Sequence, residues 1–134
     1  MSKVNIPCAT IEKVGDHIIF AKFVNNYQLD LPDVIQFNNE IDKLIPSGNI
    51  FAVIDTNNKL INPTNKAQYY LAKKGAFAQR CQCACLIIHG LPNRAFAKLS
   101  TWFYRPKFNV KVIKTLAEAN TLIEASQLQI GKLN

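Results

Sequence analysis

The sequence predicts an α/β fold with a mostly parallel sheet, and three stretches of the chain lead to this prediction. The apolar run Ile50–Ile54 is too short for a helix and rich in β-branched residues, which is typical of a strand buried on both faces. Cys83–His89 is a second run of this kind. Between them, Pro63–Lys74 has the length of a helix and is followed by Gly75, a common stop signal. Strands that alternate with helices in this way predict parallel pairing with right-handed crossovers.

The chain is expected to open with a β-hairpin. Val4–Val14 predicts the first strand, and Pro7 within it suits a sheet edge because proline cannot donate to a ladder. Gly15 and Asp16 are a tight-turn signal, and His17–Phe23 follows as the second strand.

A helix should follow this hairpin. Asp30 is a suitable N-cap, and Pro32 falls in the first turn. Apolar residues then recur at helical spacing, and they are Val34, Phe37, Ile41, Leu44 and Ile45. Pro46 to Gly48 ends the helix and leads into the central strand.

The central stretch forms a strand, a polar loop and a helix. Asp55 ends the strand, and Asn62 is the expected cap of the helix that begins at Pro63. Ala76–Gln82 is expected to be a short connection into the Cys83–His89 strand. Ligands of open α/β sheets usually bind at such strand ends.

The C-terminal part repeats the pattern. A helix from Gly90 to Tyr104 and a strand at Asn109–Ile113 are predicted. Thr115 with Glu118 three residues later indicates a capping box for a last helix. The expected order is ββαβαβαβα in a single domain of 134 residues, with Gln127–Asn134 as a loose tail.

Composition and charge limit the class of protein. No apolar run is long enough to span a membrane, and the N-terminal segment lacks the apolar core of a signal peptide, so a cytoplasmic protein is expected. The formal net charge is +7, yet residues 1–55 hold more acidic than basic residues, while Thr56–Ala117 contains no acid. This asymmetry suggests an acidic partner for one part of the surface, while the simpler interpretation is a solvated basic face that keeps the protein soluble.

The four cysteines predict buried, reduced thiols rather than disulfides. Cys81, Cys83 and Cys85 alternate along one strand, which would place all three on one face with Cα atoms at or beyond the disulfide limit. Together with His89 they could not converge on a tetrahedral zinc ion, because an extended strand spreads them apart. No phosphate-binding loop, nucleophile elbow or HExxH pattern is present. We therefore expect no metal, no cofactor and no enzymatic activity.

Several of these segments resemble the STAS-like (SpoIIAA-like, anti-sigma-factor antagonist) family over roughly Ile11–Ser126. The segments that carry the resemblance are Val53–Asp55, the helix from Pro63, Cys83–His89, Asn93–Tyr104, Asn109–Lys114 and Thr115–Ala125. The resemblance implies a right-handed βα superhelix with helices mostly on one side of the sheet, and a protein-binding switch rather than a catalyst. Family members carry a phosphorylatable Ser or Thr after an Asp and before a glycine. Thr64 stands at that position, but Pro63 replaces the acid and no glycine follows.

The hypothesis from the sequence is a non-catalytic STAS-like regulatory module that binds another protein. The expected partner-binding residues are Asp55, Asn62, Thr64, Lys66 and Arg94, with Thr64 as the phosphorylation candidate. The simpler interpretation is that Thr64 is an ordinary first-turn residue and that Asp55 caps its loop.

Two alternatives remain open at this stage. Arg94, Lys98 and Arg105 form a ridge near Trp102 that could bind nucleic acid or another anionic surface, although Trp102 also falls on the apolar stripe of its helix. A weaker alternative is a small apolar ligand held between sheet and helices.

Overall fold

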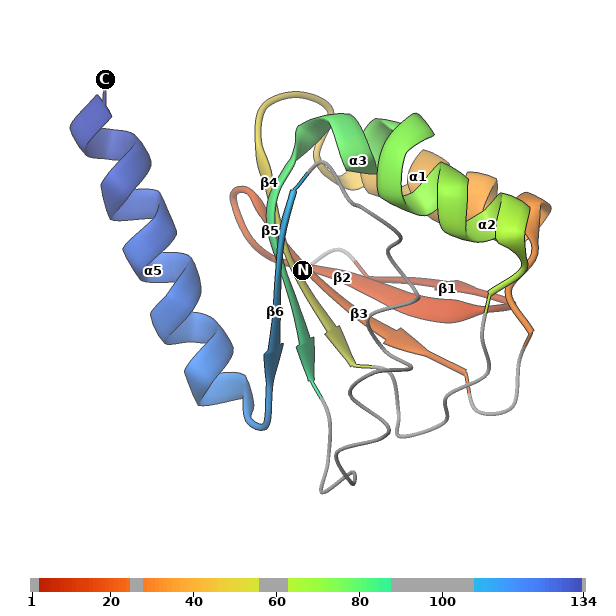
Figure 1. Cartoon of the computed structure of the whole chain (residues 1–134), viewed down its shortest axis with the longest axis horizontal. Coiled ribbons are helices and arrows are strands. Elements are labelled where there is room, and N and C mark those ends of the chain that lie inside the picture. Colours follow the sequence, from red (N-terminus) through yellow and green to blue (C-terminus); the bar gives the residue numbers. More distant parts are fainter. Residues whose placement is uncertain (1–2, 25–27, 56–62, 88–107, 134) are drawn as a thin grey trace.

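The computed structural model describes residues 3–24, 28–55, 63–87 and 108–133, and side chains up to Glu124. One six-stranded mixed sheet organises these residues, with its strands in chain order (Figure 1). The strands are β1 (Lys3–Ile6), β2 (Ala9–Gly15), β3 (Ile18–Phe23), β4 (Ile50–Asp55), β5 (Cys81–Ile87) and β6 (Asn109–Ile113). The first two pairings are antiparallel and the last three are parallel. The predicted α/β class, with antiparallel strands followed by parallel ones, is confirmed.

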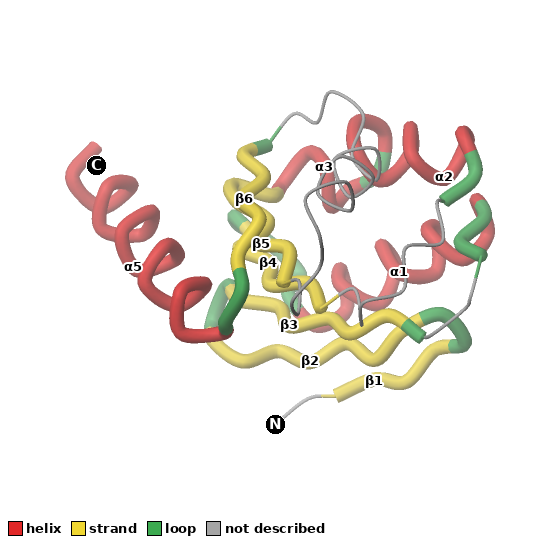
Figure 2. Tube along the Cα trace, turned by 60° about the horizontal axis from the view of Figure 1, so that its bottom comes forward, coloured by secondary structure: helices red, strands yellow, loops and turns green. Residues whose placement is uncertain are grey.

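Helices cover the two faces of the sheet unequally (Figures 1 and 2). One face carries α1 (Leu31–Leu44), α2 (Asn65–Tyr69), the π-helix η1 (Tyr70–Lys74) and α3 (Ala76–Arg80). This face holds the larger apolar core, in which the ring of Phe77 makes edge-to-face contacts with Phe37 and Phe108. The other face carries α5 (Leu116–Leu133), whose Ala119 and Ile123 pack on β4, β5 and β6.

The N-terminal segment forms two strands where one was predicted. Ile6 pairs with Ala9, so Pro7 and Cys8 make a two-residue turn between β1 and β2. The predicted Val4–Val14 strand, with its break at Pro7, is therefore two strands, because a proline that cannot donate to the ladder is placed in the turn. The predicted turn after Gly15 is confirmed, and β1 lies at the edge of the sheet.

The first helix forms as its sequence predicts. Asp30 is the N-cap, and its carboxylate accepts a hydrogen bond from the Leu31 backbone N–H at 2.8 Å. Asp33 completes a capping box by accepting from the Asp30 N–H at 3.0 Å. The apolar stripe points into the core, with Leu44 only partly buried.

The second crossover departs from its predicted form. The N-cap of α2 is Thr64, whereas the predicted cap, Asn62, lies outside the described residues. Gly75 ends η1 as predicted, but the next segment is α3 rather than a plain connection. This helix forms because Phe77 is buried in the core, and because Asn38 of α1 accepts a hydrogen bond from its backbone N–H at 2.8 Å. Neither contact is local in sequence.

The C-terminal elements agree with prediction in type and differ in extent. β5 begins at Cys81, two residues earlier than expected, and β6 is confirmed. Thr115 accepts from the Glu118 N–H at 3.2 Å, while the Glu118 carboxylate accepts from Lys114 rather than from Thr115. Residues 127–133, expected to be a tail, continue α5. The predicted helix from Gly90 to Tyr104 lies outside the described residues.

No helix in the described part of the chain is both long and apolar enough to cross a membrane.

Candidate functional site

The start of α2 is tied to the start of α1 by a hydrogen-bonded junction. The Thr64 hydroxyl donates to the Asp30 carboxylate at 2.9 Å and accepts from the Ala67 N–H at 3.3 Å. The Thr64 N–H donates to the Leu29 carbonyl at 2.9 Å. One side chain therefore caps α2 and also bonds to the cap of α1. We call Asp30 and Thr64 the cap junction.

The contacts of the cap junction lower the pKa of the Asp30 carboxyl. The largest contribution to the lowered pKa of the Asp30 carboxyl is the hydrogen bond from the Leu31 N–H, followed by that from the Thr64 hydroxyl. The Lys66 ammonium contributes to a smaller extent. A phosphate on Thr64 would remove the donated hydroxyl and place a second anion beside Asp30. Modification of Thr64 would thus open the junction, and the nearby helix dipole would have to offset that repulsion.

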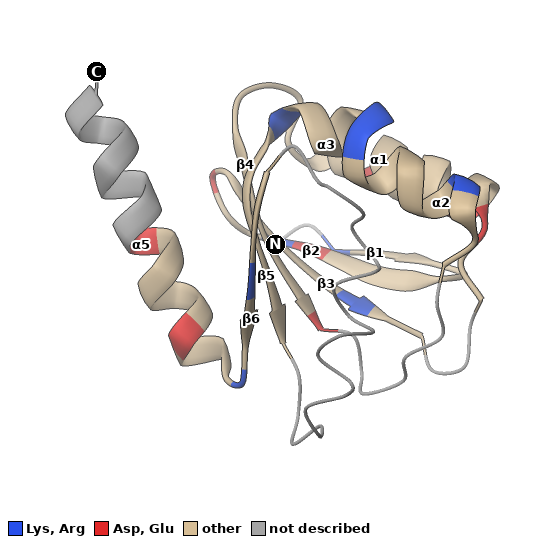
Figure 3. Ribbon diagram, in the orientation of Figure 1, with Lys and Arg blue, Asp and Glu red and all other residues tan. Residues whose placement is uncertain are grey.

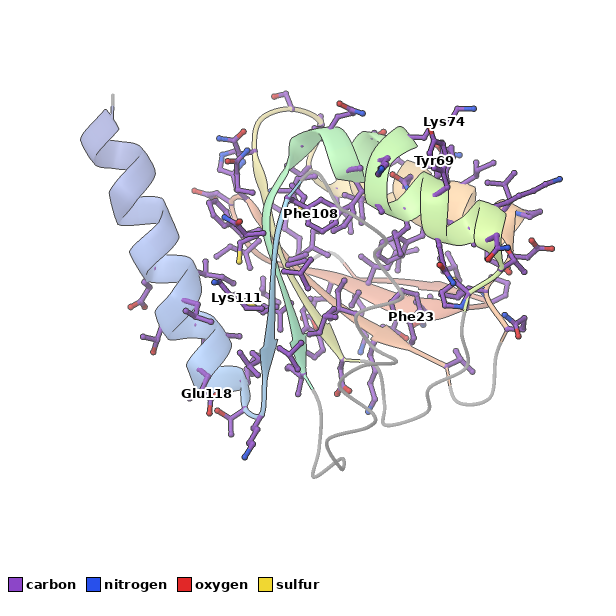
Figure 4. All side chains as sticks on the ribbon, viewed as in Figure 1. Phe23, Tyr69, Lys74, Phe108, Lys111 and Glu118 are labelled. Carbon is purple, nitrogen blue, oxygen red and sulfur yellow. The ribbon has the colours of Figure 1, made fainter. Side chains whose placement is uncertain are left out.

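A groove lies next to the cap junction, between α1 on one side and α2 with η1 on the other. Its volume is about 530 Å³, and its lining residues are Leu31, Ile35, Asn65, Lys66, Tyr69, Tyr70 and Lys74. Figure 4 places Tyr69 and Lys74 near each other on the side of the helices that faces away from the sheet. Tyr69 is 57% exposed, which is unusual for so large an aromatic side chain. The groove is thus an accessible, largely apolar surface.

The π-helix shapes one wall of this groove. The Gly75 N–H donates to the Tyr70 carbonyl at 2.8 Å, a bond that spans five residues instead of four. The wider turn places Tyr70 and Lys74, four residues apart, on the wall of the groove. A β-carbon added at Gly75 would lie 2.7 Å from the Tyr70 ring, so the glycine leaves room for that ring. π-helical turns are rare and occur frequently at functional sites.

Two lysines contribute to the lining of the groove. Lys66 and Lys74 are exposed, and they are the charged members of its lining. The rest of the lining is aliphatic or aromatic apart from Asn65. A largely apolar lining with two exposed lysines suits a ligand with an apolar body and carboxylates beside it.

The structure brings some of the predicted site residues together and leaves others apart. Thr64 and Lys66 both stand at the start of α2 beside the groove. Asp55 is buried, 9% exposed, at the carboxyl end of β4, opposite Lys22 of β3. Asn62 and Arg94 lie outside the described residues. Among the predicted surface residues that the structure describes, Lys66 lines the groove, and Thr64 caps the helix next to it.

The basic ridge of Arg94, Lys98 and Arg105, with Trp102, also lies outside the described residues. Within the described part of the chain, Lys and Arg are spread over both sides of the sheet rather than gathered in one patch (Figure 3). Arg80 is paired with Asp42 at 2.9 Å. Binding of nucleic acid through this ridge stays a prediction.

The cysteines are all free and buried, as predicted, but the three in β5 do not share a face. Cys81 belongs to the core under α1–α3, whereas Cys83 and Cys85 belong to the cluster under α5. The cause is a register shift between β4 and β5, where Ile50 pairs with Cys81 and the next residue, Phe51, pairs with Cys83. This bulge reverses the alternation after Cys81.

Cys83 and Cys85 interact with each other. The Cys85 thiol donates a hydrogen bond to the Cys83 sulfur, which, with help from the Lys111 ammonium, lowers the pKa of Cys83 to about 7 against the effect of burial. The same bond and burial raise the pKa of Cys85. Burial, and then Asp33, raises the pKa of Cys8 to about 12. Among the described residues, no group of three or more His, Cys, Asp or Glu side chains could hold a metal ion.

Two features of the site were missed in the sequence. The groove was not anticipated, although the pairs Tyr69–Tyr70 and Lys73–Lys74 in one predicted helix are a signal, since consecutive aromatic residues cannot both face the core. Asn38 was also missed, because nothing in the sequence identifies its distant partner, Phe77.

Compared with models of protein families, with curated proteins and with solved structures, the chain gives no match. The function therefore has to be argued from the site itself.

Proposed function

We propose that this protein is a non-catalytic, STAS-like module that binds another protein through the groove between α1 and the α2–η1 segment. The observation that carries the proposal is the groove itself, with an apolar and aromatic floor, an exposed Tyr69, and two lysines at its edge. Exposed aromatic side chains in apolar grooves are typical anchors of protein interfaces.

The architecture supports the STAS-like part of the proposal. Two successive crossovers, one through α1 and one through α2–α3, cover the same face of the sheet, and the parallel strands β3, β4 and β5 follow one another in order. Crossovers of one hand that advance in one direction produce a superhelix with helices on one side. The placement of α5 on the opposite face is an addition to that arrangement.

The charge of the groove points to the chemistry of the partner. Lys66 and Lys74 favour carboxylates, and the apolar lining favours Leu-, Ile- or Phe-like side chains between them. A groove between helices suits an amphipathic helix, whose anchors recur every three or four residues. The proposed partner is a protein segment with apolar anchors and Asp or Glu beside them.

Selection from a library of displayed random peptides tests this proposal directly. We expect peptides that combine apolar anchors with acidic residues to be enriched on the wild-type protein. Tyr69→Asp and the double change Lys66→Glu, Lys74→Glu should abolish their binding, because they place carboxylates on the floor and at the edge. Val14→Asp, at a similarly exposed position on β2 outside the groove lining, is the matched control and should bind as well as wild type.

Two results would refute the proposed surface. One is enrichment of peptides without acidic residues. The other is binding that survives both groove variants. If the wild type and both groove variants bind labelled nucleic acid at low salt, the result would instead favour the basic ridge outside the described residues.

Regulation at Thr64 fits this function. A phosphate there would disrupt the cap junction beside Lys66 and add about −1.5 to −2 charges at the edge of the groove. An acidic partner would then be repelled. Thr64→Glu should weaken the selected peptides while Thr64→Val leaves their binding nearly unchanged, and equal binding by both variants would argue against the switch.

A further inference from the structure

A hollow lies on the face of the sheet that carries α5, so it is separate from the groove. It lies between the first turns of α5 and the strands β2 and β3, and its volume is about 430 Å³. The sheet contributes Ile18, Phe20 and Val53 to its lining, and all three belong to the apolar cluster of this face or pack against it. The polar residues of the lining are Glu12 of β2 and Asn120 of α5. The hollow is thus a second, largely apolar surface.

Two apolar side chains at this hollow are unusually exposed. Val14 of β2 is 48% exposed, and Leu116, the first residue of α5, is 49% exposed. Both line the hollow, although they come from elements far apart in the sequence. Single exposed apolar residues are common on protein surfaces, but several that line one concave surface form a patch. Such a patch marks an interaction site.

The sequence of β3 also indicates that this face is covered by something. A strand of an antiparallel pair with one face in water alternates apolar and polar residues, whereas β3 begins with apolar residues on both sides. Ile19 and Ala21 belong to the core under α1, while Ile18 and Phe20 belong to the α5 side. α5 packs on β4, β5 and β6, and in Figure 2 no described helix lies over β1–β3 on this side. The described part of the chain therefore leaves Ile18 and Phe20 only partly buried.

Charges of both signs surround the hollow. Glu12 lines it, and the exposed Lys3 of β1 lies directly opposite Glu12 in the antiparallel register, so the two share one face of the sheet. Lys22 is also exposed, and it lies on the same face because it follows Phe20 by two residues on β3. A partner with charge of one sign would meet a like charge here. An apolar centre with acidic and basic residues around it is complementary to a second copy of itself.

From these observations we infer that the hollow is the interface of a symmetric homodimer. In a two-fold interface the same surface of both copies meets, so each contact occurs twice. Leu116 of each copy packs into the hollow of the other, against Val14 and Phe20. Glu12 of each copy faces a lysine at the rim of the other. The occupant of the hollow is therefore a second copy of this chain.

Sedimentation velocity over about 1–100 µM protein tests the dimer. The buffer should have about 0.15 M ionic strength, which screens the repulsion between two chains of net charge +7. The wild type should approach twice the 15.1 kDa of one chain as its concentration rises. Val14→Asp and Leu116→Asp should each raise the dissociation constant at least about tenfold, because each places a carboxylate in the apolar centre of the interface.

Tyr69→Asp is the matched control for these two variants. It places the same charge on an exposed apolar residue that lies outside the hollow, and it should leave the dimer unchanged. Circular dichroism of each variant confirms that it is folded. Because Val14→Asp should lose the dimer and keep peptide binding in the groove, the dimer and the proposed function can fail separately.

A second measurement uses the wild type alone, so that a variant's failure to fold cannot decide the matter. The amide NMR signals of Val14, Ile18 and Leu116 should shift between dilute and concentrated samples, whereas those of Asn65 and Tyr69 in the groove should not. Three results would overturn the inference: a wild type that stays monomeric at about 100 µM, a dimer that survives both hollow variants, or a dimer that is lost in Tyr69→Asp.

Discussion

Asn38 is the polar residue on which the second crossover depends, and replacing it with alanine should destabilise the protein substantially. Asn38 is 2% exposed. Its side-chain oxygen accepts from the Phe77 N–H at 2.8 Å, and its amide nitrogen donates to the Val34 carbonyl at 2.8 Å. Gly75, the N-cap of α3, has no side chain that could replace this acceptor. Asn38→Ala therefore leaves the Phe77 N–H buried without a partner.

The size of the effect follows from these contacts. An orphaned buried donor costs about 1–3 kcal/mol, and the lost amide leaves a small cavity. Alanine returns roughly 0.5 kcal/mol through its better helix propensity in α1. The Val34 carbonyl keeps a partner, because it also accepts within the helix. We expect a net loss of about 2 kcal/mol, a large part of the roughly 5–15 kcal/mol that stabilises a typical domain.

Urea unfolding followed by circular dichroism measures this loss. With a slope of about 2 kcal/mol per molar urea, the midpoint should fall by about 1 M. Asn39→Ala is the matched control, because Asn39 is exposed on the same helix and its replacement should change stability by no more than about 0.5 kcal/mol. If both variants unfold at the same urea concentration, Asn38 does not hold α3 in place.

The other predictions concern the cap junction, the partly buried Arg80–Asp42 ion pair and the close contact at Gly75. Thr64→Val should raise the pKa of Asp30 measured by NMR, because it removes the hydroxyl that donates to the carboxylate. A lowered carboxyl pKa stabilises the folded protein at pH values above the ordinary pKa, and that stability is lost as the pH falls through the lowered pKa. The variant should therefore lose less stability than wild type between about pH 5 and pH 2. An unchanged Asp30 titration would contradict this. Arg80→Met should lower the free energy of unfolding in urea by about 1 kcal/mol, because the Arg80 side chain is only 18% exposed. Lys43→Met should change it by almost nothing, because the Lys43 side chain is 73% exposed. Equal effects of the two changes would argue against a role for burial. Gly75→Ala should lower stability by about 1–3 kcal/mol, since the added carbon would lie 2.6 Å from a buried amide oxygen, and a thermal midpoint equal to that of wild type would show that the neighbours move aside freely.

Much of the fold could be predicted because its signals are local. The runs that form β4 and β5 are apolar over nearly their whole length. A strand that is buried on both faces needs apolar side chains on both, so such a run is a local signal. Asp30 and Pro32 mark the start of α1 through contacts within one turn of the chain. The order of elements and the mixed sheet follow from such signals together with the rules of crossover connection.

Tertiary contacts decided the rest, including the candidate site. α3 exists because Asn38, 39 residues before Phe77, accepts its N–H in the core. The bulge between β4 and β5 separates Cys81 from Cys83 and Cys85. A prediction that assumes strict alternation of side chains along a strand cannot anticipate such a bulge.

The groove depends in the same way on the packing of α1 against α2 and η1. Two lysines and two tyrosines of the second crossover become one surface only when α1 supplies the opposite wall. Periodicity in the sequence reports which side of an element is buried, because burial repeats with the local geometry of the chain. Which distant residues then meet is determined by packing between elements, and local periodicity does not record it.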